Sequence, residues 1–312
     1  MLRAIWLSLA LMLPASGMLA QETQLKRLDT GDDGRGWEAV GRLDLDRRGF
    51  CTGTLIAPDI VLTAAHCLFD KTTGQRIDPA KIEFLAGWRN GQAQAYRWVR
   101  RAVVHPDYSF DLALAADRVR NDVALLELHQ PIRNTRVTPF ETDQRPRKGQ
   151  RIGVVSYARG RSDAPSLQEV CDVIARQQGV LVMSCDVDFG SSGAPIFSFE
   201  GGVPRVVSVV SAMAEVDGRK VSLGTQLEKP LELLRAQLAS GAGVFQDAAP
   251  TMSMVGTKKR ATGAKFAKPA TNYSVPGVTF PLERPPAPSQ IIHVPTPHCG
   301  SDISPPVPWG KA

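Results

Sequence analysis

The chain alternates between short apolar, β-branched runs and clusters of turn residues. Residues 37–45 (Trp-Glu-Ala-Val-Gly-Arg-Leu-Asp-Leu) partly alternate apolar and polar positions, which is typical of a half-buried strand. Residues 52–56 and 60–63 are β-rich and flank the turn residues Pro58 and Asp59, which predicts a hairpin. Further short runs share this character: residues 82–85, 96–99, 101–104, 152–157, 168–175, 180–186 and 206–212. Many short strands separated by turns predict an all-β barrel or sandwich.

Residues 227–239 depart from this pattern. They carry leucines at helical spacing, namely Leu231, Leu234 and Leu238, and Gly241 follows as a stop signal, so we expect a helix. Residues 135–150 are polar and contain Pro and Gly, which suits a connection between two β-domains.

The two ends of the chain have different compositions from the rest. Arg3, an apolar run over 4–13 and small residues after it predict a signal peptide over 1–20, cut after Ala20 or, alternatively, after Gly17. We therefore expect a secreted or periplasmic protein without an integral membrane span. Residues 21–36 are expected to be a loosely ordered polar leader, and residues 244–312 a disordered tail, since twelve of the 23 prolines lie in the last 67 residues.

The net charge of +6 comes largely from this tail, which supplies seven Lys/Arg and three Asp/Glu from residue 246 onward. The rest of the chain is nearly balanced, so we expect no nucleic-acid partner. The tail is a candidate contact for an acidic surface or partner. A wall tether, an autoinhibitory segment and a plain spacer are the other interpretations.

The five cysteines are Cys51, Cys67, Cys171, Cys185 and Cys299, and an odd number leaves at least one without a partner in the chain. None has the short spacing of a zinc site, and the cluster of His293, His298 and Cys299 is too small to favour one, so we expect no metal or other cofactor. Residues 168–175 and 180–186 look like facing strands, which a Cys171–Cys185 bridge would clamp.

Residues 189–195 (Phe-Gly-Ser-Ser-Gly-Ala-Pro) combine serines with glycines and a closing proline. The glycines allow a tight turn that exposes backbone, and Pro195 fixes its exit. Such a turn can present one hydroxyl while aiming its own N–H groups at a neighbouring oxygen, as acyl transfer requires. By itself this turn is also compatible with an ordinary surface loop.

Two other segments make the chain recognisable. Residues 51–56 (Cys-Thr-Gly-Thr-Leu-Ile) and 61–67 (Val-Leu-Thr-Ala-Ala-His-Cys) closely resemble the histidine segment of the chymotrypsin/trypsin-like serine peptidases. Residues 121–126 (Asn-Asp-Val-Ala-Leu-Leu) resemble the family's acid segment. The resemblance covers about residues 37–239 and implies two six-stranded antiparallel Greek-key barrels over 37–138 and 139–243, the second ending in a helix that packs on it.

The resemblance also assigns roles. It implies that Ser192 is the nucleophile, His66 the general base and Asp122 the acid that orients it. The N–H groups of Gly190 and Ser192 would form the oxyanion hole, and Cys51 would be bridged to Cys67. Ser191 is the rival nucleophile, and the rivals of Asp122 by residue type are Asp107, Asp111 and Asp117.

Two departures from the animal members concern activation. Ser191 stands where they carry an aspartate that pairs with a new N-terminus, and no Ile-Val-Gly-Gly segment occurs near the start. Residues 185–195 (Cys-Asp-x-x-x-Gly-x-Ser-Gly-x-Pro) are closer to the bacterial branch that includes glutamyl endopeptidases.

Four residues bear on specificity. Asp186 lies six residues before Ser192, where trypsins carry the pocket-base aspartate, which suggests cleavage after Arg or Lys. Ser211 matches the family's pocket-wall serine, and Met213 replaces a common glycine and would narrow the pocket. Val210 replaces the histidine of glutamyl enzymes, which argues against glutamate preference.

We therefore expect an exported serine endopeptidase that cleaves protein or peptide substrates through an acyl-enzyme on Ser192. The alternative is a latent or inactive trypsin-like binding protein, although no triad residue is missing. An esterase of the α/β-hydrolase type is disfavoured because the chain lacks its Gly-x-Ser-x-Gly elbow.

Overall fold

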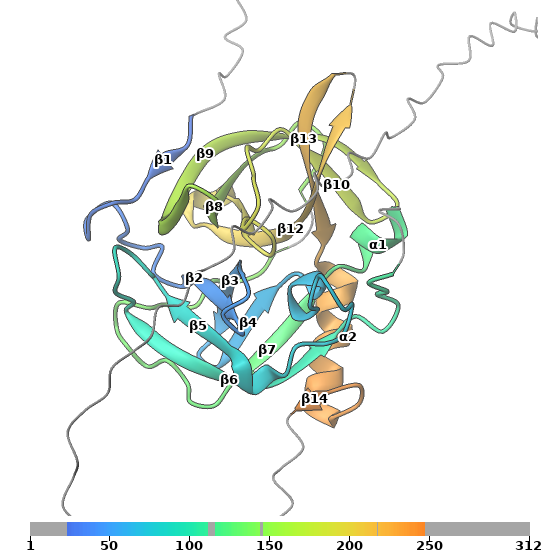
Figure 1. The fold of residues 1–312 in the computed structure, drawn as a ribbon. Helices are drawn as coiled ribbons and strands as arrows, with labels where there is room; N and C mark the ends of the chain where they lie inside the picture. Colours follow the sequence, from blue (N-terminus) through green and yellow to red (C-terminus); the bar gives the residue numbers. More distant parts are fainter. Residues whose placement is uncertain (1–23, 112–115, 144–145, 217, 247–312) are drawn as a thin grey trace, which may run out of the picture.

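The computed structural model describes residues 24–111, 116–143, 146–216 and 218–246. Its first half forms an antiparallel barrel (Figure 1). The strands are β2 (Val40–Leu45), β3 (Phe50–Ala57), β4 (Ile60–Thr63), β5 (Ile82–Ala86), β6 (Ala95–Val104) and β7 (Ala124–Leu128). They pair in the order β6-β5-β2-β3-β4-β7, and the pairing of β6 with β7 closes the barrel.

The second half forms another antiparallel barrel. Its strands are β8 (Arg151–Ala158), β9 (Arg161–Gln177), β10 (Val180–Met183), β11 (Pro195–Ser198), β12 (Arg205–Val216) and β13 (Arg219–Gln226). The order is β9-β10-β13-β12-β11-β8, closed by pairing of β8 with β9. The prediction of two six-stranded antiparallel barrels is confirmed.

The helix expected over 227–239 is α2 (Glu228–Ser240). Its three leucines are buried, and Gly241 ends it in the left-handed conformation with φ 81°. The expectation that it packs on the second barrel is wrong, because its leucines join a core with the first barrel, where α2 contacts β6 and β7. Figure 1 shows α2 running alongside that barrel.

Two short strands fasten the ends of the described chain to the opposite barrels. β1 (Lys26–Arg27) pairs with β9 of the second barrel, and β14 (Phe245–Gln246) pairs with β6 of the first. The leader was expected to be loosely ordered, but this part of it is held because Leu28 is buried and its N–H donates to Pro165 O. The first residues of the expected tail likewise form β14. The signal peptide, Cys299 and the rest of the tail lie outside the described residues.

Shorter elements complete the description: the 3-10 turns η1 (Ala65–Leu68), η2 (Pro79–Lys81) and η3 (Glu200–Gly202), and the helix α1 (Ala116–Arg120). In the described residues, no helix has the length and apolar character needed to cross a membrane.

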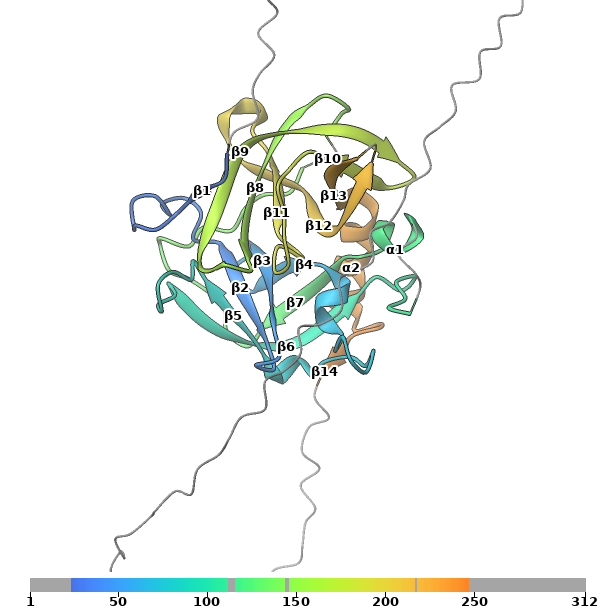
Figure 2. The ribbon, with the colours of Figure 1, turned by 45° about the horizontal axis from the view of Figure 1, so that its top comes forward.

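Aromatic side chains join the two barrels. Trp37, which precedes β2, packs against Phe197 of β11 with ring centroids 5.0 Å apart, and Phe140 from the connection between the barrels lies 4.7 Å from Phe197. Strand β3 also contacts β8 and β11 across the junction (Figure 2). This shared core fixes the relative position of the barrels, so side chains contributed by each can be held in register at the junction.

Candidate active site

His66 and Asp122 form the best-defined contact at the junction. His66 lies in η1, directly after β4, and Asp122 lies between α1 and β7. The two side chains meet with Nδ1 of His66 2.7 Å from Oδ2 of Asp122, and the His66 N–H donates to Oδ1 at 2.8 Å. Asp122 is 1% exposed. A carboxylate buried to this degree needs such donors, and here they also fix the orientation of the imidazole.

The rival carboxylates do not reach His66. Asp107, Asp111 and Asp117 are exposed, and Asp117 forms an ion pair with Arg120. The structure therefore brings Asp122, and none of these three, to the histidine.

Ser211 of β12 has a different contact from the one its sequence position suggested. Its Oγ donates to Oδ2 of Asp122, and the side chain is buried. Thr225 Oγ1 of β13 also donates to the Asp122 carbonyl oxygen at 3.2 Å. The second barrel thus holds the acid of the first, and the Ser211 hydroxyl contacts Asp122 as well as bordering the cleft.

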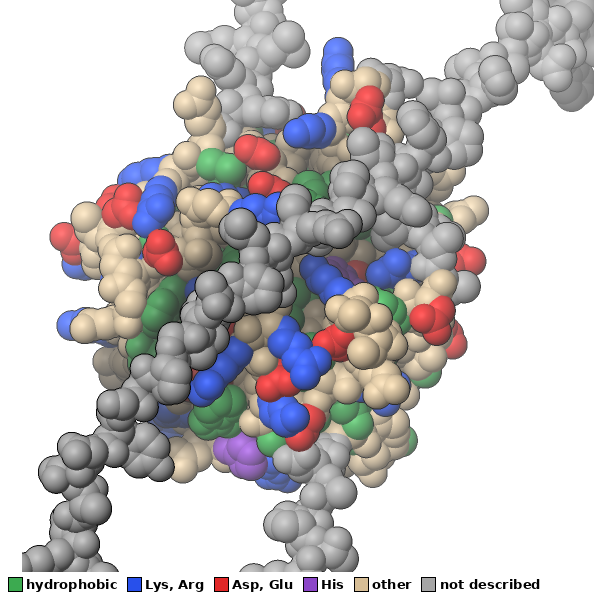
Figure 3. Space-filling model, viewed as in Figure 1, with side chains coloured by type: hydrophobic (Ala, Val, Ile, Leu, Met, Phe, Trp, Pro, Cys, Tyr) green, Lys and Arg blue, Asp and Glu red, His purple; other side chains and the backbone are tan. Residues whose placement is uncertain are grey.

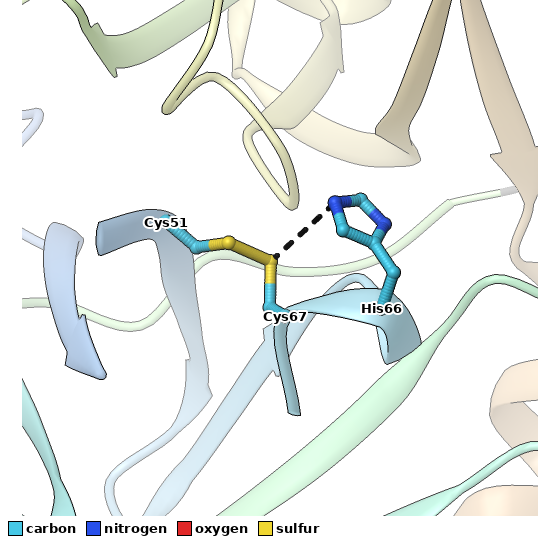
Figure 4. A group of neighbouring side chains, drawn as sticks. All are labelled: Cys51, His66 and Cys67. Atoms are coloured by element: carbon cyan, nitrogen blue, oxygen red, sulfur yellow. Dashed lines mark hydrogen bonds between the residues drawn. A yellow bond between two sulfur atoms is a disulfide. The ribbon is translucent and has the colours of Figure 1, made fainter. Parts of the chain in front are cut away.

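The imidazole lies against a disulfide (Figure 4). Cys51 of β3 is bonded to Cys67 of η1, and Nε2 of His66 is 3.9 Å from Sγ of Cys67. Both cysteines and the histidine lie close enough together to suggest a metal site. Metals bind thiolates, however, and these sulfurs are bonded to each other, so this cluster does not fit a metal ion.

The turn over 190–195 places Ser192 against the first barrel. Ser192 O accepts a hydrogen bond from the Thr52 N–H at 2.9 Å. Gly193 has φ +76°, and a Cβ there would lie 2.8 Å from Ala64 N and against Thr52 O, so this position requires glycine. Ser192 is half-buried and shares a cleft of 560 Å³ with His66. In the described chain no hydrogen bond joins Ser192 to His66; such contacts often tighten only when substrate binds.

Ser191, the rival nucleophile, is fully buried. Its Oγ donates to Ser156 Oγ and Tyr157 O, both at 3.3 Å. It therefore points into the second barrel, away from the cleft, and Ser192 is the serine available to a substrate.

Two backbone N–H groups of this turn have no partner among the described residues. The N–H groups of Ser191, Gly193 and Ala194 donate to carbonyl oxygens, whereas those of Gly190 and Ser192 donate no hydrogen bond. Gly190 has φ +99°, and its carbonyl accepts from Thr52 Oγ1 at 2.9 Å, which fixes the adjoining peptide. The pair is therefore free to bind a developing oxyanion.

Arg161 of β9 supports this turn from behind and was missed by the sequence analysis. Its guanidinium donates to Ser156 O at 2.6 Å and to Ser191 Oγ at 3.3 Å. Burial lowers the pKa of Arg161 below its usual value, and the carboxylates of Asp186 and Asp188 partly offset this effect. The arginine lies far from Ser191 in sequence and belongs to no local motif, so only the fold reveals the contact.

The second disulfide joins Cys171 of β9 to Cys185, directly before the loop that leads to Ser192. Asp186 then lines the cleft with Met213. Asp186 is exposed, its N–H donates to Gln168 Oε1 at 2.8 Å, and its carboxylate forms no ion pair in the described part of the chain. Met213 is half-buried and packs against the core around the second disulfide.

Comparison with known proteins agrees with this geometry. The family model described as a trypsin-like peptidase domain matches residues 51–204. Serine protease 23 of Mus musculus is 30% identical over 168 residues, which cover 47% of this chain and 42% of that protein. Glutamyl endopeptidase of Bacillus licheniformis is 25% identical over 150 residues, covering 48% of this chain and 45% of that protein. The chain thus spans less than half the length of these relatives.

The structural similarity covers a larger share of the chain than the sequence similarity does. The solved structure of a Glu endopeptidase in complex with MPD superposes with a TM-score of 0.56 at 17% identity, covering 69% of this chain and 96% of that one. The fold is chymotrypsin-like, and the family-model match to residues 51–204 supports a trypsin-like serine peptidase. The matches to glutamyl endopeptidases support the bacterial type of this family.

Proposed function

We propose that the chain is an exported serine endopeptidase. The observation that carries the proposal is the arrangement of one cleft: a histidine held by a buried carboxylate, an accessible serine, and two unused N–H groups beside it. The two disulfides support export because such bonds persist in oxidising compartments.

In this mechanism Ser192 Oγ attacks the scissile carbonyl while His66 Nε2 accepts its proton. Asp122 keeps Nδ1 protonated and stabilises the imidazolium. The N–H groups of Gly190 and Ser192 bind the oxyanion of the tetrahedral intermediate. His66 then protonates the leaving amine, and the resulting acyl-enzyme on Ser192 is hydrolysed by water through the same steps.

We further propose cleavage after Arg or Lys. The support is Asp186, an exposed carboxylate on the cleft wall without an ion-pair partner among the described residues. A cationic substrate side chain would supply that partner, and Met213 would offer its apolar surface to the aliphatic part of the same side chain. Ser211, which lies in β12, also lines this side of the cleft.

The test is hydrolysis of a peptide panel varied at the residue before the scissile bond. We expect hydrolysis after Arg and Lys by the secreted protein, none by Ser192→Ala, and retained hydrolysis by Ser191→Thr, the matched change at the neighbouring serine. Asp186→Asn should lower the rate after Arg by at least about tenfold relative to an apolar residue. If the protein binds these peptides without cleaving any, the alternative of a latent or inactive binding protein replaces the proposal.

A further inference from the structure

Two cations on segments from different barrels lie in the cleft lining or directly beside it. Lys71 lies in the loop that follows η1 and lines the cleft beside His66. Arg159 lies in the turn between β8 and β9. Phe189 connects the two cations, because it lines the cleft together with Lys71, and the Arg159 guanidinium lies over its ring, 4.6 Å from the centroid. Figure 3 shows that Lys and Arg side chains are numerous on this face of the molecule.

Neither cation has a carboxylate partner in the described part of the chain. Asp70, next to Lys71 in sequence, is already bound by Arg48 at 2.6 Å and by the N–H groups of Thr72 and Thr73. Arg159 forms no ion pair there either. Lys71 is exposed at the surface, and partial desolvation, followed by repulsion from Arg159, lowers its pKa. Neither cation is therefore held by an ion pair among the described residues, so each is available to bind an anion.

Arg159 is fixed in this place by the turn that carries Ser192. Its N–H donates to Phe189 O at 2.7 Å, and its guanidinium lies over the Phe189 ring, 4.6 Å from the centroid. Phe189 itself lines the cleft and directly precedes Gly190. A side chain stacked in this way loses little further freedom when it binds a ligand, which favours a defined binding position.

The part of the cleft that β12 and β13 form has a different charge pattern. There Lys220 of β13 lies across from Glu215 of β12, and Asp186 is also present, so both signs of charge occur. This end is bordered by β12, whose Ser211 contacts Asp122. The Lys71 end lies on the other flank of His66, where the Cys51–Cys67 disulfide and the loop after η1 are found.

The two flanks correspond to the two halves of a substrate. Under the proposed function, Asp186 receives the residue before the scissile bond, on the β12 flank. The leaving amine must depart beside His66, which protonates it. The residues after the scissile bond therefore run past the disulfide towards Lys71 and Arg159.

We propose, on the basis of the peptidase function above, that Lys71 and Arg159 form a subsite for an acidic substrate side chain at the first or second position after the scissile bond. The substrate class is then a polypeptide with a basic residue followed closely by Asp or Glu. The two cations act on substrate binding and take no part in the chemical step.

The test compares peptides that share Arg before the scissile bond and carry Glu, Gln or Lys at each of the two following positions. For the wild-type protein, kcat/KM should be about fivefold to tenfold higher with Glu than with Gln, and lower with Lys. The ratio of Glu to Gln should fall to near one in the Lys71→Gln/Arg159→Gln double variant, and it should shrink in 0.5 M NaCl because salt screens the attraction. The matched control is Lys220→Gln, which removes one positive charge from the other end of the cleft and should leave the ratio unchanged.

A binding arm makes the result independent of turnover. The Ser192→Ala protein, with and without the two cation substitutions, is titrated with the same peptides carrying a fluorophore, and anisotropy gives the affinities. Tighter binding of the Glu peptide that needs both cations supports the subsite. Equal affinity and equal rates for Glu and Gln overturn it, as does a preference that survives in the double variant. Absence of Ser192-dependent hydrolysis of every peptide would instead refute the peptidase function, and the subsite is then decided by affinity alone.

Discussion

The Oγ atom of Ser211 donates a hydrogen bond to the same oxygen of Asp122, Oδ2, that lies 2.7 Å from His66 Nδ1. The other oxygen, Oδ1, accepts the His66 N–H. Both carboxylate oxygens are therefore used, and the acid cannot rotate without losing one of these contacts. Ser211 belongs to the second barrel and His66 to the first, so this carboxylate links the two barrels where the chemistry is proposed to occur.

Ser211→Ala should lower kcat by about tenfold with little change in KM. The variant loses the hydrogen bond to the carboxylate of Asp122, which positions His66, and a loss of about 1.4 kcal/mol corresponds to a tenfold change in rate. Steady-state kinetics on the Arg peptide measure this effect. The control is Ser208→Ala on the same strand, where the hydroxyl donates to Thr225 O and does not contact Asp122. Equal losses in the two variants would show that the effect is one of general stability.

Gly190→Ala should reduce kcat by about a hundredfold or more. A Cβ at Gly190 would collide with the Phe50 ring and lie 3.1 Å from Ala158 Cα, and φ of +99° disfavours any other residue. The peptide must then move, and with it one of the two N–H groups proposed to bind the oxyanion. Gly49→Ala is the control because a Cβ there meets nothing within 4 Å. Circular dichroism establishes whether both variants fold, and an active, folded Gly190→Ala protein would remove this N–H from the mechanism.

Removing the second disulfide by Cys171→Ala/Cys185→Ala should lower the free energy of unfolding by about 3 kcal/mol, the value expected for closing a loop of this length. The two cysteines are 14 residues apart, and Asp186 follows the second directly. The variant should also lose preference for Arg because the start of the Asp186 loop is released. Urea unfolding and the peptide panel measure the two effects. Unchanged stability and unchanged specificity would show that the loop is held by its other contacts.

His105 should make the protein less stable as the pH falls below about 6.5, the usual pKa of histidine. Burial, the largest influence, lowers the pKa of His105, and Arg120 lowers it further, while Asp107 opposes this shift. Below pH 6.5 the His105 side chain becomes protonated in the unfolded chain but stays neutral in the folded one. The free energy of unfolding therefore decreases as the pH falls from about 6.5 to the lower pKa of the folded state. Protonation would also remove the acceptor for the Asp107 N–H, which lies 3.3 Å from Nδ1.

Urea unfolding of wild type and His105→Gln between pH 7.5 and 5.5 tests this prediction. The substitution should flatten the dependence on pH, whereas His129→Gln, which changes an exposed histidine, should not. Parallel pH dependences for wild type and His105→Gln would contradict the assignment. The lowered pKa of Asp70, about 2, acts only at more acidic pH and does not disturb the comparison.

The sequence was sufficient for features encoded by local patterns. The β-rich runs predicted a barrel or sandwich and the leucine spacing predicted α2, because strands and helices leave their periodicity in neighbouring residues. The division into two six-stranded barrels came from the family resemblance. The segments around His66 and Asp122 were sufficient to select these two residues, which the structure brings within 2.7 Å of each other. Their roles in catalysis, like that of Ser192, stay predictions.

The remaining features depend on pairings between distant residues. Leu28 looked like part of a polar leader, but β1 pairs with β9 more than a hundred residues later. The leucines of α2 predicted a buried face without indicating which barrel buries it. Arg161 and Ser211 carry no local signal for their partners, because one side chain reaches the turn of Ser191 and the other reaches Asp122 only once both barrels are closed. Long-range contacts of this kind are fixed by topology rather than by neighbouring residues.

The crossed attachment of the two terminal strands has a mechanical consequence. A pulling force between the ends of the described chain acts first on β1, held to the second barrel, and on β14, held to the first. Each is only two residues long, so these strands should peel away at low load, before either closed barrel begins to open. Under tension, the detachment of these two strands would thus come first and leave the arrangement of His66 and Ser192 intact.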